Sequence, residues 1–334
     1  MNRLAVKLEG RQNPLPALIG RFTILVGLLL AAAPPATLLA SENVAERPFA
    51  YWADVPEDGQ FVLGMVYEQA KSYTIYADGQ RIPVKVRSGG ENYGIDVRQG
   101  YLALQYGITD RWAADLEAGG TTVGWRSFSE APGYAVQSTI GIMDISFGVR
   151  YQIFNEAWGT NSPWMPTLTF RAGAVLPGTY SQSIEFAPGF RSAAIQPELL
   201  ARKHFGWTGF GAYGDALYRW NMTTENDNMI LAVGFFQQIK GWELDLGYEH
   251  LQTFSGGDIT FSLPPSDPNY LNSISYPRDV REIYDAIEAG FSYTTSKRHW
   301  KYGFHSRIVV DGNNTDLKPW FGASLDIPIG GKHE

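Results

Sequence analysis

The sequence predicts an all-β protein, namely a transmembrane antiparallel up-and-down β-barrel of about 12 strands. The composition favours strands and tight turns, because the chain has 36 Gly, 18 Tyr, 18 Phe and 10 Trp. Charged residues make up only 18% of the chain, below the roughly 25% that soluble domains carry. Apolar and polar residues alternate with period two, and the connections between the alternating segments are long and short in turn. Together these features favour a barrel in a membrane over a protein that meets only water.

The first part of the chain, residues 1–40, predicts a signal peptide. Basic residues precede an apolar run at residues 22–33, FTILVGLLLAAA, and small residues before Ser41 fit a cleavage site. The run is shorter than the roughly 20 residues with which a helix spans a bilayer, so an uncleaved anchor is the weaker alternative. We expect residues 41–59 to form a short periplasmic segment and residues 60–330 to form the barrel.

The expected strands follow in chain order, each bounded by turn residues. They lie near 60–76, 97–108, 112–123, 140–153, 165–177, 191–204, 208–220, 228–239, 242–253, 281–295, 299–311 and 318–329. The segment WELDLGYE at residues 242–249 is typical, since its even-numbered residues are apolar or aromatic and its odd-numbered residues are charged or Gly. Such a strand has one face for lipid and one for a polar interior.

The connections and the aromatic residues favour the cell outer membrane of a Gram-negative-type bacterium. Outer-membrane barrels have tight periplasmic turns and longer external loops, whereas a soluble sandwich does not sort its loops by length. Aromatic residues near strand ends are expected to form the interfacial girdles: Trp112, Tyr151, Tyr218, Trp220, Trp242, Trp300 and Trp320. A soluble periplasmic all-β protein remains the alternative.

Several function classes are excluded or disfavoured. The chain has no Cys, which excludes disulfides, thiol nucleophiles and zinc ribbons. A net charge of -7 and the lack of basic runs argue against a nucleic-acid partner. The sequence contains no G-x-S-x-G or H-E-x-x-H motif, and the carboxylates Asp258, Asp267 and Asp279 fit no calcium loop. For an outer-leaflet lipid-modifying enzyme, the best candidates are His250 and Ser255 near one external rim.

Three blocks of sequence resemble, in the same order, the outer-membrane transporters of phenol-degradation meta pathways, which look like relatives of the hydrophobic-solute channels. The blocks are LQYGITDRWAADLEAG at 104–119, GIMDISFGVRYQIF at 141–154 and FRAGAVLPG at 170–178. The resemblance implies a barrel that transports small solutes, and the association with phenolic compounds rests on it alone. The interval from Ser41 to the first strand is too short for the N-terminal hatch of the fatty-acid channels, so transport by a hatch mechanism is not expected.

Parity along the strands predicts which charged side chains line the lumen. The candidates for a charged constriction are Asp115, Glu117, Asp144, Arg150, Arg171, Arg202, Asp215, Arg219, Glu243, Asp245, Glu249, Lys301 and Arg307. Two interpretations stay open: the groups set a transverse field that selects small solutes, or they pair into salt bridges that fill the bore and stiffen the barrel. The longest loop, residues 254–280, is expected to fold into the external mouth.

The sequence thus predicts a monomeric outer-membrane channel for passive uptake of small solutes, with aromatic or apolar compounds among the candidates. The expected partners are outer-membrane lipid and a small-molecule solute. No cofactor or enzymatic activity is expected, because downhill diffusion needs none. A non-conducting structural or surface-interaction barrel is the second interpretation, and the lipid-modifying enzyme is the third.

Overall fold

The computed structural model describes part of the chain, and the two compact units of the chain are residues 1–37 and 38–334. The described residues all belong to the second unit. They are 53–331 apart from 78–79, 84–85, 89–90, 94, 126–136, 159–163, 181–191, 207, 223–225, 264–266, 268–273, 276–279 and 317–318. The predicted signal peptide lies outside them. Within these ranges no helix has the length and apolar character needed to cross a membrane.

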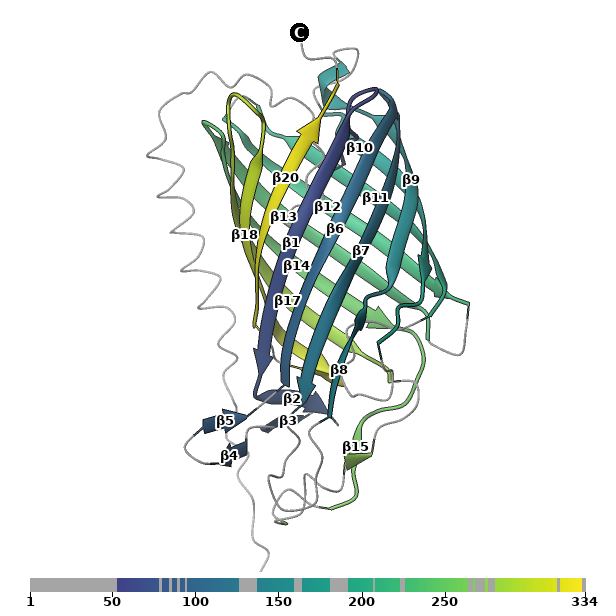
Figure 1. The fold of residues 1–334 in the computed structure, drawn as a ribbon, viewed down its shortest axis with the longest axis vertical. Helices are drawn as coiled ribbons and strands as arrows, with labels where there is room; N and C mark the ends of the chain where they lie inside the picture. The colour runs from purple at the N-terminus through teal and green to yellow at the C-terminus, as the bar shows by residue number, and fades with distance from the viewer. Residues whose placement is uncertain are drawn as a thin grey trace, which may run out of the picture. The chain divides into compact units, whose positions relative to one another are not determined.

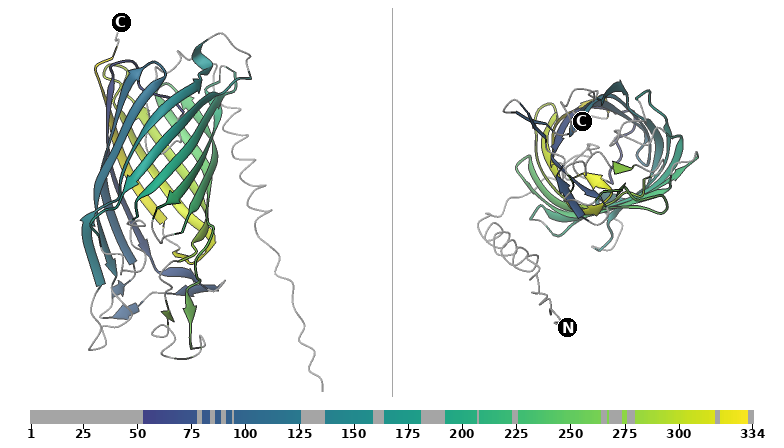
Figure 2. Two further views of the ribbon diagram at one scale, coloured as in Figure 1. Left: turned by 90° about the vertical axis from the view of Figure 1, so that its right-hand side faces the viewer. Right: turned by 90° about the horizontal axis from the view of Figure 1, so that it is seen from below.

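Long antiparallel strands form one closed barrel (Figures 1 and 2). In chain order they are β1 (Phe61–Ser72), β6 (Ile95–Thr109), β7 (Trp112–Trp125), β9 (Ile145–Phe154), β10 (Thr167–Leu176), β11 (Ala194–His204), β12 (Phe210–Asn221), β13 (Asn228–Ile239), β14 (Trp242–Thr253), β17 (Ile283–Thr294), β18 (Lys301–Asn313) and β20 (Pro319–Ile329). Each strand pairs with the next one, and β1 also pairs with β20, so the sheet closes on itself. The predicted fold class is confirmed.

One barrel strand is interrupted where the sequence predicts a continuous strand over 140–153. β8 (Gln137–Ile142) and β9 both pair with β7, and Met143 and Asp144 separate them. The carboxylate of Asp144 accepts hydrogen bonds from the Gly178 amide at 2.9 Å and from the Tyr180 hydroxyl at 3.1 Å. The segment that follows β10 thus replaces the regular ladder at this point. Local alternation does not reveal such a distant contact.

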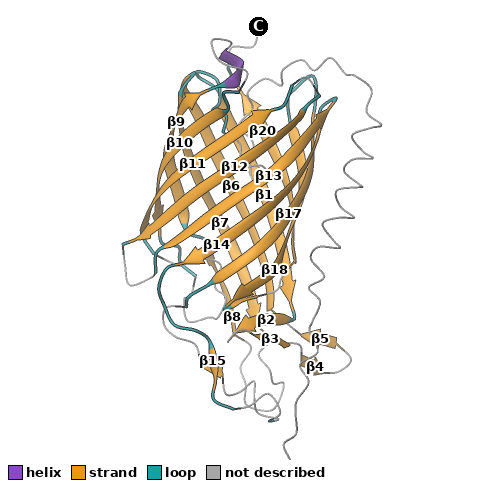
Figure 3. Cartoon of the chain, turned by 180° about the vertical axis from the view of Figure 1, so that it is seen from behind, coloured by secondary structure: helices purple, strands orange, loops and turns teal. Residues whose placement is uncertain are grey.

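The short elements lie mostly at one end of the barrel, at the bottom of Figure 1. They are β2 (Thr74–Ala77), β3 (Gln80–Pro83), β4 (Val86–Ser88), β5 (Glu91–Tyr93), β15 (Thr260–Phe261), β16 (Ile274–Ser275) and β19 (Thr315–Asp316). The opposite end has the tight turns between β6 and β7 and between β13 and β14, and the 3-10 helix η1 (Glu156–Trp158) (Figure 3). By the barrel convention the tight turns mark the periplasmic end, and the longer loops mark the external end.

The barrel wall is apolar outside and polar inside. Along β14, Trp242 and Leu244 are each 51% exposed on the outer face, while Glu243 between them is 6% exposed. This arrangement is the reverse of a soluble protein, and it is favourable where lipid surrounds the wall. Trp320, predicted for the girdle, is instead inside and 8% exposed, so that prediction is wrong. The even-numbered residues of β20 face inward, and Trp320 packs with Ile75 of β2.

Candidate functional site in the barrel lumen

Charged side chains on the inner wall gather in two groups, one rich in arginine and the other rich in carboxylates. The arginine arc lies on β9, β10 and β11 and comprises Arg150, Arg171 and Arg202, with one carboxylate, Glu198. The carboxylate arc lies on β14 and β17 and comprises Glu243, Asp245, Glu249 and Glu288. The strand order gives the separation of the two arcs around the barrel. Counted from β10, β17 is the fifth strand in one direction and the seventh in the other. β14, which carries three of the four carboxylates, is the fourth strand from β10, so the two arcs lie on different sides of the bore.

The arginine arc is balanced by carboxylates on both sides. Asp115 of β7 bonds Arg171 at 2.6 Å, Nη2 to Oδ1, and lies 3.4 Å from Nε of Arg150. Glu198 lies 3.4 Å from Nη1 of Arg171. The side chains of Asp115, Arg150 and Arg171 are only 2 to 5% exposed. A buried group of this kind is rigid, because each charge depends on its partner.

The carboxylate arc is partly neutralised from β18. Nζ of Lys301 donates to Glu243 at 3.1 Å, and Nη1 of Arg307 donates to Glu249 at 3.0 Å. The Tyr284 hydroxyl also donates to Glu249, at 2.7 Å. The arc carries four carboxylates against these two cations, so it keeps a negative excess.

The other predicted lumen residues are placed as follows. Asp215 and Asp245 are buried, 7% and 8% exposed. Arg219 of β12 reaches Asp144 at 3.3 Å across the strands between them, and Glu117 of β7 is half-buried.

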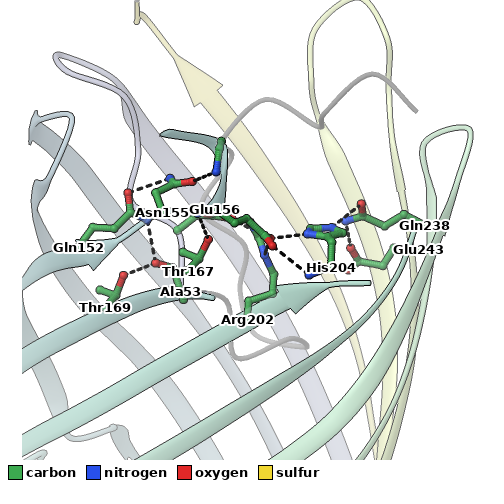
Figure 4. Close-up of polar contacts among 12 residues, drawn as sticks. Ala53, Gln152, Asn155, Glu156, Thr167, Thr169, Arg202, His204, Gln238 and Glu243 are labelled. Carbon is green, nitrogen blue, oxygen red and sulfur yellow. Dashed lines mark hydrogen bonds and ion pairs between the residues drawn. The ribbon is translucent and has the colours of Figure 1, made fainter. Parts of the chain in front are cut away.

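Ala53, the first described residue, lies beside the inner wall near the periplasmic end of the barrel (Figure 4). Ala53 is fully buried, and its carbonyl accepts hydrogen bonds from Gln152 at 3.1 Å and from the Thr169 hydroxyl. The carboxylate of Asp54, 3% exposed, pairs with Arg202 of the arginine arc. We call residues 53–58 the N-terminal strap. Sequence reasoning missed these contacts, because no periodic pattern precedes β1.

Glu156 of η1 lies beside the strap and holds the end of β11. Its carboxylate is 2.5 Å from Nδ1 of His204 and accepts hydrogen bonds at 3.1 Å from the His204 amide and from Nζ of Lys203. Burial alone would raise the pKa of Glu156, but the hydrogen bonds from His204 lower the pKa to about 2.

This shift predicts an acid-dependent loss of stability. The folded-state pKa lies below the unfolded value of 4.5, so the contribution of Glu156 is complete above pH 4.5 and is lost as the pH falls toward about 2. Glu156→Gln should flatten this part of the curve of unfolding free energy against pH, measured with urea at pH 6 and pH 3. Equal pH dependence in the two proteins would contradict the assignment.

Apolar side chains close over the external end of the bore. Ile75 and Ile82 of the β2–β3 hairpin and Ile259 of the β14–β17 loop pack on the wall residues Val97 and Val123, and all five are at most 3% exposed. The described part of the predicted flap therefore reaches the mouth.

A polar clasp holds the base of this flap. Asp258 accepts hydrogen bonds from Nη2 of Arg281 at 2.9 Å and from the Asn314 amide at 2.8 Å. Asn314 also accepts a hydrogen bond from the Ile259 amide at 2.9 Å. The clasp thereby ties the flap to the loop between β18 and β20.

The two residues proposed for a lipid-modifying enzyme, His250 and Ser255, have different hydrogen-bond partners. Nδ1 of His250 is 2.7 Å from Asp285, whereas the Ser255 hydroxyl bonds Asn226. His250 therefore has an orienting carboxylate but no serine bonded to it. Among the described residues, no cluster of His and carboxylates could hold a metal ion.

The closed barrel, its apolar wall and its polar interior define the class: this is a transmembrane β-barrel with the fold of Gram-negative outer-membrane channels. That fold and the lipid-facing wall place the chain in the outer membrane.

One solved structure has the same fold, and two others match with lower scores. The COG4313 outer membrane channel from Pseudomonas putida F1 superimposes with a TM-score of 0.61 at 12% identity, covering 85% of this chain and 100% of that one. The translocator domain of autotransporter NalP from Neisseria meningitidis gives a TM-score of 0.44 at 10% identity, over 93% of this chain and 97% of that one. The toluene transporter TodX from P. putida gives 0.38 at 8% identity, over 84% and 92%. No family model and no curated protein matches the sequence.

Proposed function

We propose that the protein is a monomeric outer-membrane channel for the passive uptake of small solutes. The observation that carries the proposal is the uneven distribution of charge on the inner wall, because a fixed field orients a charged or polar solute as it passes. The carboxylate arc keeps a negative excess, whereas the cations of the arginine arc are balanced by Asp54, Asp115 and Glu198. A barrel with a purely structural role needs its interior charges to be paired, and it does not need this excess.

The external entrance bears on the class of solute. The side chains packed there are apolar and nearly buried, with Ile75, Ile259 and Trp320 among them. A solute that enters between them would meet apolar surface, which favours apolar or aromatic solutes over sugars. The solute would then meet the charged arcs. Small aromatic compounds with one polar group fit best a path that is apolar at the external end and charged further inside.

A non-conducting barrel is the second candidate, and a specific observation favours it. The strap fills part of one end and the apolar cluster fills part of the other. The lipid-modifying enzyme has less support, because Ser255 bonds Asn226 rather than His250.

Conductance and solute flux together test the proposed function. Refolded protein in a planar bilayer should show discrete conductance steps, and proteoliposomes should admit a phenolic compound faster than a sugar or a fatty acid of similar concentration. A folded barrel without steps and without flux would overturn the channel and favour the structural barrel. Steps with equal flux of all three solutes would keep the channel and overturn the proposed solute class.

The flap gives a further prediction for the same recordings. Deleting residues 262–278 removes the β15–β16 pairing of Thr260 with Ser275 and should raise conductance. A variant in which the same residues are replaced by an equally long Gly-Ser linker separates loss of these contacts from loss of length. Unchanged conductance in both variants would show that the flap does not restrict the mouth.

A further inference from the structure

Two neighbouring periplasmic turns carry exposed cations that the charged interior does not use. The β13–β14 turn contains Lys240, and the β17–β18 turn contains Lys297 and Arg298, all exposed. The turns are adjacent, since the Thr294 amide donates to the Gly241 carbonyl at 2.8 Å. Neither turn contains an acidic residue, and in the described part of the chain no ion pair joins these three cations to a carboxylate.

The other periplasmic turns lack this excess. In the β6–β7 turn, one acidic residue, Asp110, offsets the charge of Arg111. At the end of β11, Lys203 pairs with Glu156 at 3.1 Å. The uncompensated charge is therefore confined to the side of the rim where β13, β14, β17 and β18 end.

An aromatic row lies directly beside the cations on the outer wall. Trp242, Tyr293 and Tyr302 are opposite one another in register on β14, β17 and β18, and they are 51%, 36% and 45% exposed. The rings of Trp242 and Tyr293 are 4.9 Å apart, and Arg298 lies 5.2 Å over the ring of Trp300. Trp and Tyr in such rows mark the level of lipid headgroups, so the cations lie at the depth of the phosphates.

The backbone conformation of the β13–β14 turn independently indicates a role for Lys240. Lys240 has φ 51° and His299 in the next turn has φ 52°, a left-handed conformation that Gly, Asn and Asp adopt at lower cost than Lys. A two-residue turn with positive φ at both positions is ordinarily built from Asn-Gly or Asp-Gly. The chain thus keeps a cation at a position where a neutral residue would be more stable, and a functional role accounts for that choice.

From these observations we infer that Lys240, Lys297 and Arg298, with the aromatic row, form a binding patch for the phosphate of anionic phospholipids in the periplasmic leaflet. Each exposed cation near a membrane surface adds electrostatic attraction for anionic lipid, and the aromatic row fixes its depth. The patch lies on the outer wall and does not require the bore to conduct, so it stands or falls separately from the proposed channel.

Lipid retention tests the patch on the full-length protein. Purified protein in mixed micelles with equal phosphatidylglycerol and phosphatidylcholine is examined by native mass spectrometry for bound lipid. The wild type should retain phosphatidylglycerol preferentially, and Lys240→Gln/Lys297→Gln/Arg298→Gln should reduce that preference by about tenfold. The matched control, Lys71→Gln/Arg98→Gln/Arg111→Gln, removes three exposed cations elsewhere and should keep it. Heat-modifiable gel mobility verifies that every variant is folded.

A single variant separates lipid binding from turn stability. Lys240→Asn should stabilise the turn, because Asn tolerates positive φ better, and should still weaken the lipid preference. The inference is overturned if the wild type shows no preference, or if the patch and control variants lose it equally.

Discussion

A variant that lacks the chain up to Glu57 is expected to conduct severalfold more current than the full-length protein. The N-terminal strap occupies the periplasmic mouth, where the Ala53 carbonyl is bonded to Gln152 and Thr169 and the Asp54 carboxylate is bonded to Arg202. Removing the strap clears that space and also frees a cation of the arginine arc. Single-channel recording of the refolded variant in a planar bilayer measures the change.

Point variants supply the controls for the strap. Asp54→Ala combined with Arg202→Ala removes both members of the pair, and Glu156, which lies 3.7 Å from Nε of Arg202, keeps Lys203 and His204 as partners. The strap should therefore detach without the penalty of a lone buried ion. Asp58→Ala alters an exposed residue of the same segment and should leave conductance unchanged. If truncation and the double variant both conduct like wild type, the strap does not restrict the path.

Replacing Asp115 by Ala is expected to lower the free energy of unfolding by about 3–5 kcal/mol, as removal of one partner from a buried ion pair does. Asp115 faces both Arg150 and Arg171 with side chains at most 5% exposed. Its loss would leave two guanidinium groups close together without the carboxylate between them. Urea unfolding in lipid vesicles, followed by Trp fluorescence, measures the effect.

An exposed ion pair provides the comparison for Asp115. Asp96 and Arg98 are 3.2 Å apart, but their side chains are 37% and 60% exposed, so Asp96→Ala should cost only about 0–1 kcal/mol. Equal destabilisation by the two substitutions would mean that water reaches Asp115 freely. The arginine arc would then be a solvated surface rather than a rigid network.

The sequence predicted the barrel well because alternation is a local property. The segments 228–239 and 242–253 coincide with β13 and β14, and the same parity separated Glu243 from Trp242. Parity, however, gives only the direction of a side chain. It does not show that Lys301 reaches Glu243 across β17, or that Asp115 serves two arginines.

Two of the failures share one physical cause, which is contact between segments distant in the chain. The break at Met143 and Asp144 depends on Gly178, and the strap depends on Arg202. Trp320 was assigned to the girdle because aromatic residues near strand ends are common there, although parity within β20 indicates its inward direction.

The pairing of β1 with β20, which closes the barrel, has a consequence for folding. Ten residue pairs join these strands, from Phe61 with Ile329 to Ala70 with Trp320. They connect segments near the two ends of the described chain. Contacts so distant in sequence form slowly, because the loop between them must first be closed. Closure therefore waits for the final strand, and a nascent chain that ends before β20 exposes two unpaired strand edges that invite aggregation.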